Sequence, residues 1–129
     1  MPKYNVIIPN DVQPKPEIHE IEAAEIISKY FKSDVKFLRR GQNKSPDILI
    51  VKDNIRWEIK SPTGKGKHNI QHNVQDAARQ SANIVIDSRR SKIHQTKFNN
   101  ELQRQFNIVA RVKKVLLITK RKIVVAFTK

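Results

Sequence analysis

Residues 45–62 read SPDILIVKDNIRWEIKSP, and this stretch says more about the fold than any other part of the chain. It holds two apolar runs, residues 48–51 and 55–59, each of a length typical of a β-strand. The dipeptide at 53–54 is Asp-Asn, and both residue types tolerate the unusual backbone dihedrals of tight turns. The stretch therefore predicts a β-hairpin with a two-residue turn.

A two-residue turn also predicts which residues face each other. It pairs Leu49 with Glu58 and Asp47 with Lys60. Because side chains alternate along a strand, Asp47, Glu58 and Lys60 share one face of the hairpin. Asp47 and Glu58 become diagonal neighbours, with Cβ atoms roughly 7–8 Å apart. The opposite face is apolar and holds Ile48, Ile50, Ile55, Trp57 and Ile59.

Two carboxylates at that separation can share a divalent cation, and Lys60 stands beside them. Charges on the solvated face of a strand are the simpler interpretation of the same pattern. Pro46 immediately before Asp47, and the common face of the three charged residues, favour a catalytic interpretation. The hairpin therefore predicts a metal-dependent phosphodiesterase site.

A helix is predicted at about 17–31, and one of its acids is out of place. Glu20 falls inside the apolar arc, whereas Glu22 falls on the opposite side and Glu25 near or beyond its edge. A carboxylate that points toward a core is costly unless it is paired or binds a metal. Glu20 is thus a candidate for the metal site, although pairing with an arginine or a frayed first turn also explains it. The arc consists of Ala23, Ala24, Ile26, Ile27, Tyr30 and Phe31.

Length and composition set the class of protein. The 129 residues suit one domain with a sizeable core. Cysteine is absent, which excludes disulfides, a thiol nucleophile and a thiolate zinc site. The sequence shows no apolar run of transmembrane length and no signal-peptide pattern, so a soluble protein with a cytoplasmic site of action is expected.

The charge is large and uneven. The net charge is +14, and residues 61–129 hold 15 basic and 3 acidic residues, against 11 and 9 in residues 1–60. Such a field attracts polyanions and speeds their encounter. Nucleic acid is the expected partner. A membrane surface is a poorer match, since the basic residues are not gathered on one amphipathic helix.

The remaining pattern predicts the architecture. Residues 1–15 are a lead-in segment in which residues 6–8 could add an edge strand, and the domain occupies residues 16–129. The order of elements is α-β-β-β-α-β-α-β-β, which predicts an α/β (α+β) domain with one mixed sheet flanked by helices. After the first helix, strands are expected at 35–38, 48–51, 55–59, 83–87, 115–119 and 123–127, helices at about 69–82 and 95–106, and loops at 39–45 and 61–68.

Several residues are candidates for contacts with nucleic acid. Two lysines lie in the glycine-containing loop at 61–68, two amides border the apolar face of the helix at 69–82, and two arginines follow the strand at 83–87. Lysines hold phosphate with little specificity, and arginine can hold it bidentately. The candidates are Lys65, Lys67, Asn73, Gln80, Arg89 and Arg90.

Two motifs carry a resemblance to known families. Glu20, Pro46-Asp47 and Glu58-Ile59-Lys60 together resemble the PD-(D/E)XK nuclease superfamily. The longer string WEIKSPTGKGKHNIQHNVQDAARQSANIVIDSRR, residues 57–90, is similar to C-terminal toxin nucleases of contact-dependent growth inhibition, the CdiA tRNase-type domains. This resemblance implies cleavage of RNA, above all tRNA, in a competing cell, with an acidic immunity protein as partner.

The superfamily resemblance also implies a mechanism. Asp47, Glu58 and the backbone carbonyl of Ile59 would bind Mg²⁺ or another divalent cation, and Glu20 would contact the metal or its water. Lys60 would orient the attacking water and stabilise charge on the phosphate.

Three alternatives remain open from the sequence. A metal-independent ribonuclease toxin of the barnase/EndoU/colicin/RelE fold would use other side chains. A DNA endonuclease of the restriction or resolvase type would share the metal site, and a non-catalytic nucleic-acid-binding module would cut nothing. The side chains available to the metal-independent enzyme are Lys60, Thr63, His68, His72 and Arg89.

Overall fold

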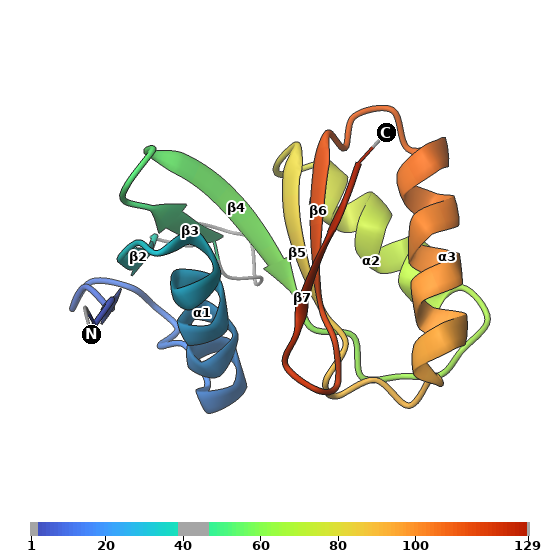
Figure 1. Cartoon of the computed structure of the whole chain (residues 1–129), viewed down its shortest axis with the longest axis horizontal. Coiled ribbons are helices and arrows are strands. Elements are labelled where there is room, and N and C mark those ends of the chain that lie inside the picture. Colours follow the sequence, from blue (N-terminus) through green and yellow to red (C-terminus); the bar gives the residue numbers. More distant parts are fainter. Residues whose placement is uncertain (1–2, 39–46, 129) are drawn as a thin grey trace.

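The structure is a computed structural model that describes residues 3–38 and 47–128 (Figure 1). The polar loop predicted at 39–45 lies outside the described residues. No helix in the described part of the chain is both long and apolar enough to cross a membrane. The elements are β1 (Val6–Ile7), α1 (Ile18–Phe31), β2 (Val35–Phe37), β3 (Asp47–Ile50), β4 (Ile55–Lys60), α2 (Asn69–Ala78), β5 (Asn83–Asp87), α3 (Gln95–Ile108), β6 (Lys114–Ile118) and β7 (Val124–Phe127).

The strands form one mixed sheet, which confirms the predicted fold class. Their spatial order is the sequence order, from β1 to β7. β2, β3 and β4 are antiparallel neighbours, whereas β4, β5 and β6 run parallel. The parallel pairs need crossover connections, and α2 and α3 supply them. The two helices therefore cover the same face of the sheet, and α1 covers the other (Figure 1).

Each face of the sheet carries its own hydrophobic core. On the first face α1 packs with Ala23, Ala24 and Ile27 against alternate residues of the strands, such as Ile59 and Val85. On the second face α2 and α3 pack against the intervening residues, such as Ile84 and Ile86. Because β5 contributes to both cores, residues 84–86 in the middle of its sequence NIVID are a continuous apolar run rather than an alternating one.

The β3–β4 hairpin forms as predicted, but its register differs by two residues. Ile50 faces Ile55 and Asp47 faces Glu58, so residues 51–54 all belong to the turn. Asn54 adopts a left-handed conformation, and its N–H donates to the Ile50 carbonyl at 2.8 Å. A shift of two residues leaves every side chain on its predicted face.

The connection after α1 explains the longer turn. The N–H of Val51 donates to the carbonyl of Asp34, and the N–H of Lys52 donates to the hydroxyl of Ser33. These two bonds engage residues that a two-residue turn would have paired across the hairpin. Hydrogen bonds from distant residues thus set a register that the local turn chemistry does not contain.

Two further elements differ from the sequence prediction. Helix α2 ends at Ala78, four residues before the expected end. The hydroxyl of Ser81 accepts the N–H of Asn83, a local bond that competes with helix continuation and leads into β5. At the other end of the chain, β1 pairs in parallel with β2, and Val12 is buried in the first core. The lead-in segment therefore packs with the domain, and the boundary at residue 15 stays a prediction.

Candidate active site

Asp47 and Glu58 stand directly opposite each other on β3 and β4. This position brings their Cβ atoms to about 4.5–5.5 Å, closer than the diagonal arrangement expected from the sequence. Asp47 is 6% exposed and Glu58 is 0% exposed. Two buried carboxylates at this separation repel each other, so an arrangement of this kind calls for nearby positive charge.

The two oxygens of Asp47 have different surroundings. Oδ2 lies 3.0 Å from Nη2 of Arg56, which is half-exposed. Oδ1 is buried, and no hydrogen-bond partner for it exists among the described residues. An acceptor of this kind is costly to bury without a ligand. Oδ1 is therefore an acceptor that could bind a cation.

Lys60 lies on the same face of the sheet as the two acids. Its register partner on β5 is Ile86, and the partner of Glu58 is Ile84, both in the second core. The sequence prediction that Asp47, Glu58 and Lys60 share one face agrees with this placement. That face is the one covered by α2 and α3.

Arg56 is part of this site, and the sequence analysis missed it. Besides its contact with Asp47, its Nη2 donates to the backbone carbonyl of Gln80 at 3.2 Å. Its position was available from the alternation of β4, which places residues 56, 58 and 60 on one face. The erroneous two-residue turn hid its diagonal relation to Asp47.

The donor set suits a hard divalent cation held mainly by water and substrate. Within residues 3–38 and 47–128, no group of three or more His, Cys, Asp or Glu side chains is arranged to hold a metal. Mg²⁺ is usually bound through only one or two carboxylates together with waters and phosphate oxygens. Asp47 and Glu58 meet that requirement, and Oδ1 of Asp47 is the acceptor open to such an ion.

Glu20 does not join the two acids. Its Oε1 accepts the backbone N–H of Glu17 at 2.8 Å and so caps the first turn of α1. This contact gives one oxygen of Glu20 a backbone donor inside the apolar arc. Glu20 belongs to the helix on the first face of the sheet, whereas Asp47 and Glu58 project from the second.

Arg89 binds a buried carboxylate rather than standing ready for phosphate. Its Nε and Nη2 donate to the two oxygens of Asp87 at 2.9 and 2.8 Å. Asp87 is 0% exposed, and Nη2 of Arg89 also donates to the carbonyl of His19. The hydrogen bond that Arg89 donates to Asp87 raises the pKa of Arg89, with the charges of Asp87 and Glu22 adding to it against the opposing effect of burial. These contacts give Arg89 a structural role in place of the predicted phosphate contact.

The other candidate residues are spread over both faces. Arg90 is exposed, and its Nη1 lies 2.8 Å from Nε2 of His19 beside α1. Asn73 donates to the carbonyl of Asn69 within α2. Gln80 meets Arg56 through its backbone carbonyl. Of these three residues, Gln80 contacts Arg56, which in turn pairs with Asp47. Phosphate binding by Arg90, Asn73 and Gln80 stays a prediction.

Three of the side chains proposed for a metal-independent site, Thr63, His68 and His72, lie around the start of α2. The rings of His68 and His72 are exposed, with centroids 6.1 Å apart, and Nδ1 of His68 lies 3.1 Å from Oε1 of Gln71. Thr63 is exposed in the preceding loop. Arg89 is held by Asp87 on the other face of the sheet. The set is therefore not assembled around Arg89.

Comparison with known proteins gives one family and one fold neighbour. Residues 44–124 match the family described as the contact-dependent growth inhibition CdiA C-terminal domain. No curated protein matches the chain. The fold is similar to a structure described as a CdiA-CT/CdiI toxin and immunity complex from Burkholderia pseudomallei, with a TM-score of 0.62 and 15% sequence identity. The alignment covers 97% of this chain and 99% of that chain.

Proposed function

This chain belongs to the family of contact-dependent growth inhibition CdiA C-terminal domains, and we propose that it is a toxin that hydrolyses phosphodiester bonds of nucleic acid. The observation that carries the proposal is the buried pair of Asp47 and Glu58, with one oxygen of Asp47 lacking a partner among the described residues. The net charge of +14 supports a polyanionic substrate.

The proposed chemistry divides between the acids and the neighbouring cations. Asp47 and Glu58, with the carbonyl of Ile59, would hold Mg²⁺ or another divalent cation. Such an ion supplies Lewis-acid stabilisation of the phosphate and a more acidic water. Lys60 donates to the attacking water or to a phosphate oxygen and offsets developing negative charge. Arg56 holds Oδ2 of Asp47 and so leaves Oδ1 to bind the cation.

RNA, above all tRNA, is the proposed substrate. Folded RNA offers closely spaced phosphates to the strongly basic segment at 61–129, and tRNA places the site of action in the cytoplasm of a target cell. The similar structure from Burkholderia pseudomallei is a complex of a toxin with its immunity protein. We extend that partnership to this chain, for which a net charge of +14 calls for an acidic partner.

Four incubations test this function. The purified chain is mixed with total tRNA and with plasmid DNA, each in Mg²⁺ and in EDTA. Cleavage of tRNA that requires Mg²⁺ is the expected result. Cleavage that persists in EDTA would support the metal-independent ribonuclease, and preferential cleavage of plasmid would support a DNA endonuclease. Binding without cleavage of either substrate would reduce the chain to a binding module.

Glu20→Gln is expected to leave cleavage and stability nearly unchanged. Glutamine also accepts a backbone N–H in a capping box, so the substitution keeps the helix cap while removing the charge that a metal ligand needs. Initial rates and melting temperature are compared with those of Glu25→Gln, an exposed acid of the same helix. A rate at least tenfold below that of Glu25→Gln, with an unchanged melting temperature, would restore Glu20 to the metal site.

A further inference from the structure

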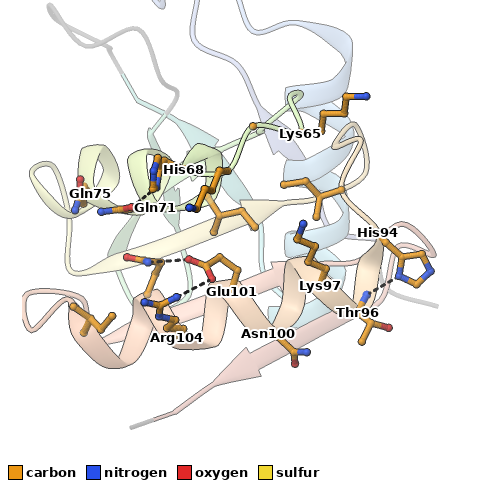
Figure 2. A pocket seen from close by; sticks show the side chains of 16 residues that line it. Lys65, His68, Gln71, Gln75, His94, Thr96, Lys97, Asn100, Glu101 and Arg104 are labelled. Atoms are coloured by element: carbon orange, nitrogen blue, oxygen red, sulfur yellow. Dashed lines mark hydrogen bonds and ion pairs between the residues drawn. The ribbon is translucent and has the colours of Figure 1, made fainter.

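A groove of about 1180 Å³ lies between α2, α3 and the loop that precedes α2 (Figure 2). It exceeds the roughly 300–1,000 Å³ of typical small-molecule sites. Ile70 and Ile93 give it a buried apolar surface, while most of the other lining side chains are polar. In Figure 2, Gln71 and Gln75 of α2 lie across the groove from Lys97, Glu101 and Arg104 of α3. Its size suits a segment of a polymer.

Positive charge comes from both walls of the groove. Lys65 and Lys67 belong to the loop, and Lys97 and Arg104 to α3. Lys97 and Arg104 are seven residues apart, which places them on one side of the helix, two turns from each other. Glu101 is the one carboxylate among the described lining residues. Its Oε1 accepts a hydrogen bond from Nε2 of Gln105 at 3.0 Å, and its Oε2 lies 3.8 Å from Nη1 of Arg104.

The three lysines have nothing to neutralise them within the described part of the chain. Lys65, Lys67 and Lys97 are exposed, and none of their side chains has a hydrogen bond or ion pair with a described residue. Lysines on facing walls attract a ligand with several successive anionic groups rather than a single anion. The amides of Gln71, Gln75 and Asn100 add donors of the kind that contact phosphate oxygens.

We infer that this groove holds the sugar-phosphate backbone of a nucleic-acid strand, on the same side of the sheet as the acid pair. No Phe, Tyr or Trp occurs among the described residues that line it, and the rings there are the imidazoles of His68 and His94. Binding there is therefore directed mainly at phosphates and depends little on sequence. The ligand is the substrate of the proposed nuclease, and the inference rests on that function to this extent.

The fold connects the groove to the acid pair. The loop that carries Lys65 and Lys67 directly follows β4, which ends at Lys60, so the two lysines come five and seven residues after the strand. Both sites lie on the face of the sheet covered by α2 and α3, and α2 contacts β4 and β5 as well as α3. A strand that passes the beginning of α2 therefore reaches the groove from the acid pair along the basic loop.

Binding of a single-stranded RNA of about 16 nucleotides tests the groove, measured by fluorescence anisotropy over a range of salt concentrations. The chain carries Glu58→Gln so that the probe stays intact. Lys67→Gln with Lys97→Gln removes one charge from each wall. We expect about tenfold weaker binding near 0.1 M salt, and a slope of log affinity against log salt that is smaller by about 1.4.

Lys15→Gln with Lys29→Gln is the matched control, because both lysines are exposed and lie outside the groove. It removes the same charge and should change the slope far less. Equal slopes in the two double variants would overturn the inference. Unchanged RNA binding together with weaker binding of polyglutamate would also overturn it, and would assign the groove to an acidic polypeptide.

Cleavage of tRNA, measured with Glu58 restored, separates this inference from the proposed function. If the parent chain cleaves tRNA while the two double variants have the same slope, the nuclease proposal stands and the groove is wrong. If no variant cleaves but the groove variant has the smaller slope, the groove stands and the nuclease proposal fails.

Discussion

Glu58→Gln is expected to abolish cleavage while leaving RNA binding intact. Glu58 is fully buried and directly opposite Asp47, and glutamine keeps its shape but removes the charge that would hold a cation. A loss of roughly three orders of magnitude or more in rate is the scale seen when one member of a catalytic unit is removed. Affinity for RNA should stay equal or rise slightly, because one carboxylate no longer repels phosphate.

The experiment needs a control for the loss of a negative charge as such. Asp76→Asn removes a carboxylate from the exposed surface of α2, on the same side of the sheet. Single-turnover rates, anisotropy and melting temperature are compared for the parent, Glu58→Gln, Asp47→Asn and Asp76→Asn. Both Glu58→Gln and Asp47→Asn should be inactive, and Asp76→Asn active. A fully active, folded Glu58→Gln would exclude the two-carboxylate site.

The second large effect concerns stability. Asp87→Ala is expected to lower the free energy of unfolding by about 3 kcal/mol or more, because it leaves Arg89, whose side chain is 11% exposed, with only the half-exposed Glu22 at 3.9 Å as a counter-charge. For a domain of this size the loss corresponds to a fall in melting temperature of roughly 10–20 °C. Thermal and urea unfolding measure it.

Asp76→Ala is the matched control for this prediction. Asp76 pairs with Arg79 at 3.6 Å, but the two side chains are 59% and 71% exposed, so the expected cost is below about 1 kcal/mol. Similar losses for the two aspartates would show that the Asp87–Arg89 pair does not stabilise the domain, and would return Arg89 to the candidates for phosphate binding.

The effect of Asp87→Ala should not vary between about pH 6 and pH 8. The Asp87 hydrogen bond raises the pKa of Arg89 above a value that is already far into the alkaline range. A group whose pKa is raised in the folded state stabilises the fold below its unfolded pKa and loses that contribution as the pH rises through the folded value. Arg89 is charged on both sides of the neutral range, so its contribution there is constant.

Local sequence patterns are enough to define the elements and the faces of the sheet. Alternation in residues 47–60 places Asp47, Glu58 and Lys60 on one face of the sheet and the apolar residues on the other. The prediction of the faces stays correct although the register is wrong by two residues, because side chains alternate with a period of two. The continuous run NIVID indicates a central strand, buried on both faces. These features are local, since strand and helix periods are properties of neighbouring residues.

Which charged groups meet depends on tertiary packing instead. Asp47 faces Glu58 because Ser33 and Asp34, distant in sequence, bind residues 51–52 and lengthen the turn. The sequence makes Arg89 a candidate for phosphate binding, but in the structure it binds Asp87 of β5 and the His19 carbonyl of α1. Its charge alone does not distinguish phosphate binding from an internal ion pair. The groove likewise arises where α3 packs beside α2, from residues 30 or more apart such as Lys67 and Lys97. Contacts of this kind depend on long-range packing, which no local period encodes.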